Sequence, residues 1–192
     1  MKIIKPDMDF EQTRNLIRNS NLHRKLKEKY GEGLPSKDWL EILLSVPVNL
    51  FGKDLQSKTV LDLGCGSTGR SYDYEGMQNE KYGKRDFEPW FPRALHLLGV
   101  RIIGVDYGKL DDEEFDHLGY TNLLSPVALK SIPDNSIDLA HARQLYSSPQ
   151  LEKMSSAPYS ANRPEYISEK LDAILIPQLH RIVKPEGFYF HN

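Results

Sequence analysis

A glycine-rich loop and two acidic residues are the parts of this 192-residue sequence with the clearest chemical potential. The loop, Gly64-Cys65-Gly66-Ser67-Thr68-Gly69, follows a short apolar run. Glycine lets the main chain approach another molecule closely, because no Cβ restricts its dihedral angles. Asp62 lies two residues before the first glycine, and Asp106 ends a second apolar run. A glycine loop and an acid at the ends of neighbouring strands are typical of a nucleotide-type cofactor site, where the acid accepts hydrogen bonds from ribose hydroxyls.

Such a site requires strands that end at one edge of a sheet. From Thr59 onward, short apolar runs alternate with helical patterns, which favours an α/β fold with a parallel sheet. We expect strands at 60–63, 100–106, 120–124, 136–141 and 188–191, a helix over 88–99 and a turn at 185–187. A long helix should begin at Pro164 and be kinked by Pro177.

Residues 1–57 are expected to form an N-terminal helical cap, separate from a cofactor-binding domain over residues 58–192. Apolar residues between Phe10 and Leu26 are spaced as one helix face that ends near Gly31. Ser36 is suited to cap a second helix, and Pro47 should end it.

Composition and charge exclude several classes of function. A net charge of −2 gives no electrostatic reason to expect a nucleic acid partner. No apolar run approaches the roughly 20 residues that span a bilayer, and the N-terminus lacks the apolar core of a signal peptide. Cys65 is the only cysteine, and no histidines are paired at metal-ligand spacing. We therefore expect a cytoplasmic protein without a metal site.

Four segments, in the correct order, resemble the class I S-adenosylmethionine-dependent methyltransferases over residues 58–192. They are Val60–Gly66, Gly104–Asp106, Ile132–Leu139 and Leu179–Gly187. The resemblance implies a Rossmann-like, doubly wound and mainly parallel sheet of about five strands in the order 3-2-1-4-5, without the family's usual strands 6 and 7. It also implies S-adenosyl-L-methionine as the cofactor and methyl transfer as the activity.

The resemblance implies a set of cofactor-binding residues: Asp62, Gly64, Cys65, Gly66, Gly69, Asp106, Tyr107, Asn122 and Leu123. The three glycines would line the methionine part of the cofactor, and Asp62 would help to hold it. Asp106 would bind the ribose and Tyr107 would lie along the adenine. The family often has an acid where Asn122 stands, and an amide carbonyl can accept the same hydrogen bond from the adenine amino group.

Catalysis of methyl transfer depends mainly on aligning the acceptor with the activated methyl group. A base is needed only where the acceptor must lose a proton. His141 is the candidate base, although a structural or cofactor-lining role is an equal alternative. Arg143 or Tyr146 could orient an acidic or polar acceptor, which we expect to be a small molecule or a sugar- or lipid-type compound. The rival hypotheses are a catalytically inactive, methyltransferase-like binding or regulatory protein and an NAD-dependent oxidoreductase.

Two features depart from the family pattern. The apolar strand at 188–190 would leave an exposed sheet edge. Three solutions stay open: the segment 2–5 covers it, a second subunit covers it in a homodimer, or the sequence is a fragment. Long loops at 70–87 and 144–163 are expected at the ligand-binding edge, where they could shape the mouth of the substrate site.

Overall fold

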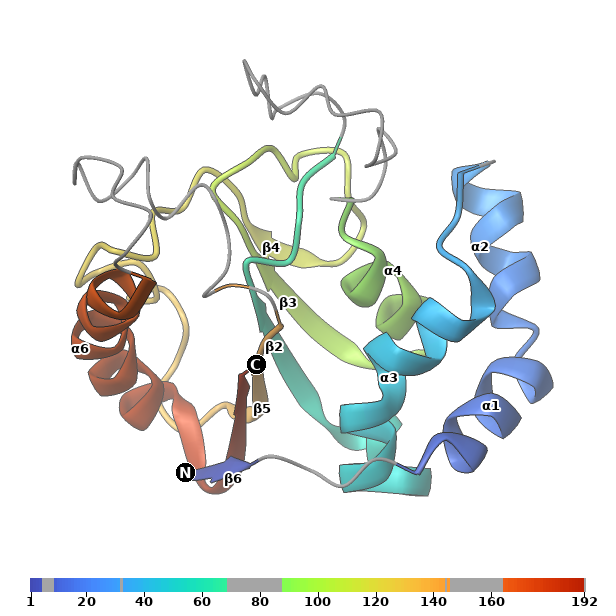
Figure 1. Ribbon diagram of the computed structural model, residues 1–192, viewed down its shortest axis with the longest axis horizontal. Coiled ribbons are helices and arrows are strands. Elements are labelled where there is room, and N and C mark those ends of the chain that lie inside the picture. Colours follow the sequence, from blue (N-terminus) through green and yellow to red (C-terminus); the bar gives the residue numbers. More distant parts are fainter. Residues whose placement is uncertain (5–8, 32, 69–87, 144, 146–163, 192) are drawn as a thin grey trace.

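The computed structural model describes residues 1–4, 9–31, 33–68, 88–143, 145 and 164–191. These residues form an α/β fold in which one parallel sheet has helices on both faces (Figure 1). The expected loop at 70–87 lies outside the described residues, and so does the loop at 144–163 apart from Leu145.

The sheet of the described residues has six strands in the order β1-β6-β5-β2-β3-β4, and every neighbouring pair is parallel. The strands are β1 (Lys2–Ile4), β2 (Thr59–Leu63), β3 (Arg101–Val105), β4 (Asp116–Leu118), β5 (Ile137–Ala142) and β6 (Val183–His191). Apart from β1, this order is the predicted 3-2-1-4-5. The Rossmann-like arrangement of these five strands is thereby confirmed.

The edge expected to be exposed on the last strand is covered by the N-terminus. β1 pairs with β6 through Lys2 with Phe188 and Ile4 with Phe190. The amino group of Met1 also donates to the carbonyl of Pro185 at 2.9 Å. Of the three solutions left open, the N-terminal segment is the one this fold uses. A homodimer stays a prediction, and this edge of β6 no longer supports it.

Two predictions along the sheet were wrong: the position of the third strand and the turn at 185–187. The third strand of the predicted order is Asp116–Leu118, not 120–124, because Tyr120 has a left-handed φ of 55° that ends extended pairing. The predicted turn at 185–187 is an irregularity within β6. Ile137 pairs with Val183 whereas Leu139 pairs with Phe188, so the extra residues of β6 bulge out between these two pairs.

The described helices are α1 (Phe10–Asn19), α2 (Leu22–Tyr30), α3 (Lys37–Phe51), the short 3-10 helix η1 (Gly52–Ser57), α4 (Trp90–Leu97) and α6 (Pro164–Ile182). Ser36 caps α3 as predicted, since its side chain accepts from the amide of Trp39 at 3.1 Å. The single helix expected from Phe10 to Gly31 is two helices, because Asn21 has a left-handed φ of 53°. Pro47 does not end α3, which continues to Phe51.

Two hydrophobic clusters lie on opposite faces of the sheet (Figure 1). α1 to α4 cover one face, where residues such as Leu26 and Leu44 pack with Val60 and Leu139. α6 covers the other face, where Leu175 packs with residues that include Leu61 and Tyr189. The helices before residue 57 thus share a core with the sheet, and the division into two domains at that point stays a prediction. No described helix is long and apolar enough to cross a membrane.

Candidate functional site

The strand order reverses between β2 and β5. The chain runs outward from β2 to β3 and β4, then crosses to β5 on the other side of β2. In open α/β sheets, ligands bind outside the carboxyl ends of the strands at such a switch point. The glycine loop follows β2, the Asp106 segment follows β3, and residues 143 and 145 follow β5. The fold therefore brings the predicted cofactor loop and the candidate substrate residues to one edge.

Asp106 ties the glycine loop to the end of β3. Its carboxylate accepts hydrogen bonds from the amide of Gly66 at 2.9 Å and from the amide of Gly108 at 2.8 Å. The amide of Gly64 donates to the carbonyl of Val105 at 2.8 Å. Gly64 and Gly66 have φ values of 70° and 91°, which residues with a Cβ rarely adopt. Since Asp106 is 4% exposed, it acts here as a buried acceptor that shapes the loop.

Gly64 is also constrained by a neighbour from the other side of the switch point. A Cβ on Gly64 would meet Cδ1 of Leu145 at 2.9 Å. Leu145 is buried and belongs to the same hydrophobic cluster as Leu63. The segment after β5 therefore packs directly against the glycine loop.

The residues predicted to hold the adenine lie next to Asp106. The amide of Thr121 donates to the carbonyl of Asp106 at 2.8 Å. Oδ1 of Asn122 accepts from the amide of Leu124 at 2.9 Å, which closes an Asx turn, and Leu123 is buried. Tyr107 is 50% exposed. A carbonyl oxygen has two lone pairs, so an adenine amino group would share Oδ1 of Asn122 with this turn. Gly69 lies outside the described residues.

Asp62 and His141, predicted to have separate roles, form a buried pair. Nδ1 of His141 lies 2.7 Å from Oδ1 of Asp62, and the two residues are in register on β2 and β5. The His141 ring stacks between Phe91, with centroids 4.3 Å apart, and Phe190, with centroids 5.3 Å apart. Burial raises the pKa of Asp62, and the hydrogen bond and charge of His141 partly offset this effect. Asp62 is thus directed toward His141 beneath the glycine loop.

This pairing sets a condition on catalysis by His141. The residue is 1% exposed, and among the described residues no group forms a hydrogen bond with its Nε2. A carboxylate on Nδ1 fixes the tautomer that leaves Nε2 as the basic atom. A general base must lie within hydrogen-bond reach of the proton that it removes. The groups that bury Nε2 would have to move before an acceptor could reach it.

A charged network under the end of the glycine loop was not predicted from the sequence. Nε of Arg93 donates to Oε2 of Glu113 at 3.0 Å, and Nη2 donates to Oε1 at 2.6 Å. Arg93 also pairs with Glu88, and Glu113 accepts from the Thr68 hydroxyl at 2.8 Å. An arginine within the apolar run 90–95 was the available signal, because a charge on a buried helix face requires partners.

Aromatic rings from two helices enclose the Arg93 guanidinium. Its central carbon lies 4.2 Å from the centre of the Tyr30 ring and 4.7 Å from that of Trp90. Burial by itself lowers the pKa of Arg93, but the hydrogen bonds and charges of Glu113 and Glu88 outweigh it and the pKa is raised. Burial, followed by the charge of Glu113, raises the pKa of Tyr30 to about 12. The network joins α2, α4 and the glycine loop.

Arg143 extends from the end of β5 toward α3. Its Nη1 donates to the carbonyl of Ile42 at 3.0 Å, and its guanidinium lies 5.6 Å from the centre of the Trp39 ring. Burial lowers the pKa of Arg143. Tyr146, the other residue expected to orient the acceptor, lies outside the described residues.

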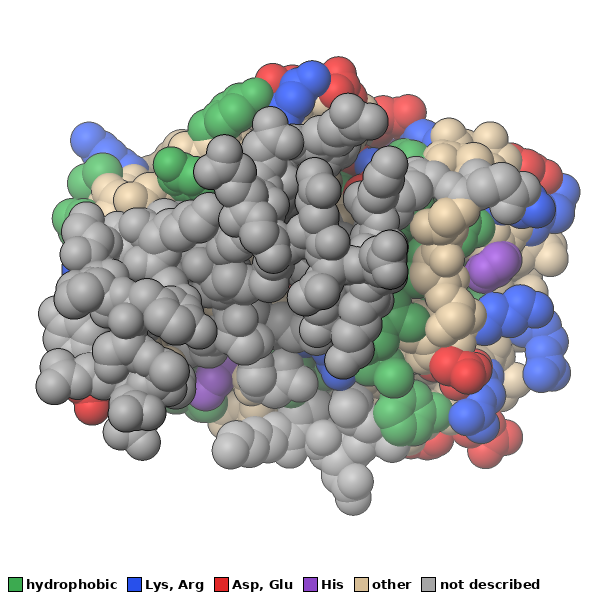
Figure 2. All heavy atoms as spheres, turned by 45° about the horizontal axis from the view of Figure 1, so that its top comes forward, with side chains coloured by type: hydrophobic (Ala, Val, Ile, Leu, Met, Phe, Trp, Pro, Cys, Tyr) green, Lys and Arg blue, Asp and Glu red, His purple; other side chains and the backbone are tan. Residues whose placement is uncertain are grey.

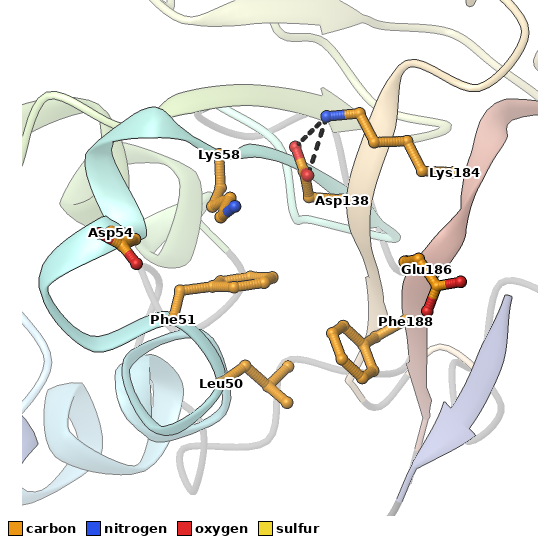
Figure 3. A pocket seen from close by; sticks show the side chains of 9 residues that line it. Leu50, Phe51, Asp54, Lys58, Asp138, Lys184, Glu186 and Phe188 are labelled. Atoms are coloured by element: carbon orange, nitrogen blue, oxygen red, sulfur yellow. Dashed lines mark hydrogen bonds and ion pairs between the residues drawn. The ribbon is translucent and has the colours of Figure 1, made fainter.

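A shallow pocket of about 300 Å³ lies at the other edge of the sheet (Figure 3). Among its lining residues, Lys184 donates to both carboxylate oxygens of Asp138 at 2.8 Å, and Lys58 lies over the Phe51 ring. These residues lie near the amino ends of β2 and β5, so the pocket is not part of the predicted cofactor site. Within the described ranges, no group of three histidine, cysteine or acidic residues could hold a metal ion.

Among the described residues visible in Figure 2, the charged side chains do not gather into one patch. Basic and acidic side chains alternate over the described part of this view. Such a distribution lacks the basic stripe that typically binds nucleic acid.

Comparisons with known proteins found few relatives. No protein-family model matches this chain, and no curated protein matches it. Among solved structures, it is similar to the crystal structure of geranyl diphosphate C-methyltransferase from Streptomyces coelicolor A3(2) in complex with Mg2+, geranyl diphosphate and S-adenosyl-L-homocysteine. The match has 13% sequence identity and a TM-score of 0.37, and it covers 96% of this chain and 64% of that protein. A likeness at this level assigns neither an activity nor a substrate to this chain.

Proposed function

We propose that this protein is an S-adenosyl-L-methionine-dependent methyltransferase that acts on a small molecule or a sugar- or lipid-type acceptor. The observation that carries the proposal is the junction of the glycine loop with Asp106 at the switch point of the sheet. The amide of Gly66 donates to Asp106 there at 2.9 Å. Ribose-binding acids in such sheets lie at the end of the strand beside the glycine loop, as Asp106 does.

The residues present fit the cofactor in part. Asp106 is 4% exposed and each of its carboxylate oxygens already accepts from a backbone amide, so ribose hydroxyls would have to use the remaining lone pairs. Gly64 and Gly66 have positive φ values, which give the loop after β2 the tight turn that such a site requires. The half-exposed Tyr107 and the Asn122 turn lie beside Asp106, where an adenine would be held. Asp62 fits less directly, since its carboxylate is directed toward His141. We propose that Asp62 and His141 support the loop from below.

The bound cofactor would supply an activated methyl group on a sulfonium. The chain would contribute the alignment, which can account for much of the barrier reduction in a transfer between two bound groups. Ring stacking against Phe91 and Phe190 keeps His141 out of solvent. We therefore assign the base role to His141 only for acceptors whose entry uncovers its buried Nε2. An acceptor that is already anionic needs no base.

Two other functions stay open. A catalytically inactive, methyltransferase-like binding protein would share the cofactor site, and the sealed position of His141 favours it somewhat. An NAD-dependent oxidoreductase would also combine a glycine loop with an acid at the end of the next strand. Asp62 before the loop and the 184–187 segment, which resembles the methyltransferases, argue against the oxidoreductase.

Calorimetric titration separates these functions. The proposal predicts binding of S-adenosylmethionine and S-adenosylhomocysteine and no binding of NAD. Asp106→Asn should weaken both sulfur cofactors by about tenfold or more, because it removes a charged acceptor from the ribose site. Asp116→Asn, on the exposed strand β4, is the matched control and should leave both affinities unchanged. Binding without turnover of any acceptor would favour the inactive relative, and binding of NAD alone would refute the proposal.

A further inference from the structure

Arg143 has hydrogen-bonding capacity that the described protein does not use. A guanidinium carries five N–H donors, and here a single one is accounted for, by the carbonyl of Ile42 at 3.0 Å. No carboxylate among the described residues pairs with Arg143, and burial alone accounts for its lowered pKa. Arg93, by contrast, is held by two glutamates. Among the described residues, the remaining donors of Arg143 are therefore available to a ligand or to water.

The position of Arg143 is fixed by its neighbours in the chain. His141 is in register with Asp62, and Leu145 lies against Gly64. Arg143, midway between them, therefore runs beside the end of β2 where the glycine loop begins. Alternate residues of a strand share a face, so its side chain follows that of His141 onto the α3 side, where it meets Trp39. The guanidinium thus lies at the rim of the switch-point crevice.

Trp39 shapes what can bind beside this guanidinium. Its ring lies 5.6 Å from the guanidinium carbon, and it is only partly exposed. A contact with an aromatic ring restricts the guanidinium, and a guanidinium favours a forked contact with the two oxygens of a single anionic group. The pair forms a site for an oxyanion with an apolar side.

We propose that Arg143 and Trp39 form an oxyanion subsite for the methyl acceptor, so that the acceptor carries a carboxylate or a phosphate. This inference rests on the proposed methyltransferase function. An anionic acceptor also fits the chemistry of the crevice. The cationic sulfonium of the cofactor and the guanidinium of Arg143 would repel each other at this edge. An anionic acceptor between them would attract both and offset the repulsion. The sealed position of His141 adds to this, because an anionic nucleophile needs no base.

The test uses benzoate and inorganic phosphate as probes at constant ionic strength. The chain has two tryptophans, Trp39 and Trp90, and fluorescence of the wild-type protein should change saturably with at least one probe. Trp39→Phe identifies the part of the signal that comes from Trp39. Tighter binding of benzoate would indicate an acceptor with a carboxylate, and tighter binding of phosphate would indicate a phosphorylated acceptor.

Variants decide whether Arg143 holds the probe. Arg143→Gln should abolish the saturable response, and Arg143→Lys should weaken it by about tenfold because the fork is lost while the charge remains. Arg101→Gln is the matched control, since Arg101 is exposed at the start of β3. Thermal unfolding shows whether each variant is folded. If Arg143→Gln does not fold, Arg143→Lys still decides the test. No saturable response in the wild type, or an equal response in Arg143→Gln, would overturn the inference.

A titration with S-adenosylhomocysteine separates the two proposals. Arg143→Gln should bind this cofactor product as tightly as the wild type does. A matching loss of its affinity would mean that the guanidinium holds the cofactor's own carboxylate, which contradicts an acceptor subsite. If the wild type does not bind S-adenosylhomocysteine, the proposed function fails, whereas the anion titration without cofactor still decides whether the subsite exists.

Discussion

Replacing Gly64 by alanine tests how the glycine loop is held. The added Cβ would lie 2.9 Å from Cδ1 of Leu145, and Gly64 has a φ of 70°. A left-handed conformation costs a residue with a Cβ about 1–2 kcal/mol. Overpacking against a buried neighbour costs about 1–3 kcal/mol more. We therefore expect Gly64→Ala to lower the free energy of unfolding by about 2–5 kcal/mol in total.

Gly99 provides a matched control. It has a φ of 79°, and a Cβ there would meet only Nε2 of Gln56, at an ordinary contact distance of 3.7 Å. Gly99→Ala should therefore cost the conformational part alone, about 1–2 kcal/mol. Both variants lose the same entropy of glycine in the unfolded chain, so that effect cancels in the comparison. The difference between them isolates the contact with Leu145.

Urea unfolding followed by circular dichroism measures both variants. Repeating the Gly64→Ala substitution in a Leu145→Ala background should make it less costly, with a coupling energy of about 0.5–3 kcal/mol. Equal costs for Gly64→Ala and Gly99→Ala would refute the packing of the β5 segment on the loop. A fully additive double variant would refute it as well.

Three further predictions concern the buried polar groups. Arg93→Met should lower the free energy of unfolding by about 3–5 kcal/mol, because it leaves buried carboxylates unpaired. Arg101→Met, at an exposed site, should change it by less than about 1 kcal/mol. Urea unfolding measures both variants. The raised pKa of Tyr30, about 12, favours the neutral phenol in the folded state, so the stability that it contributes is present below pH 10 and is lost as the pH rises toward 12. Tyr30→Phe should therefore lose less stability than the wild type between about pH 9 and pH 11, a range that brackets the ordinary tyrosine pKa. An equal loss in the two proteins would contradict this prediction. Asp62→Ala should lower the free energy of unfolding by about 1–3 kcal/mol, because it leaves the buried His141 ring without this partner. Asp62→Asn keeps an acceptor oxygen and should lower it by less. Equal losses of stability in thermal unfolding would argue against the pairing of Asp62 with His141.

Local signals in the sequence predicted β2, β3 and the loop after β2 well. Each of these elements is encoded by a pattern of a few residues: the apolar run before Gly64, the glycines of the loop, and the apolar run that ends at Asp106. The order of five strands followed from the resemblance and is what the sheet has. The third strand was misplaced because Leu123 and Leu124 read as strand residues, whereas they pack from a loop onto the core.

Contacts between distant residues could not be predicted in this way. β1 is three residues long, too short to carry a periodic pattern, and its partner Phe188 lies at the other end of the chain. The pairing of Asp62 with His141 depends on the register of β2 and β5, which no single segment encodes. The partners of Arg93 come from either side of β3 in the sequence. Each of these was decided by tertiary packing.

The position of the cofactor is the central claim, and amide NMR shifts on adding S-adenosylhomocysteine test it most directly. We predict that the largest shifts cluster at the carboxyl ends of β2 and β3, at Gly64, Gly66, Tyr107 and Asn122. Residues of the opposite pocket, such as Phe188, should not shift. Shifts confined to that pocket, or none anywhere at saturating ligand, would contradict the account.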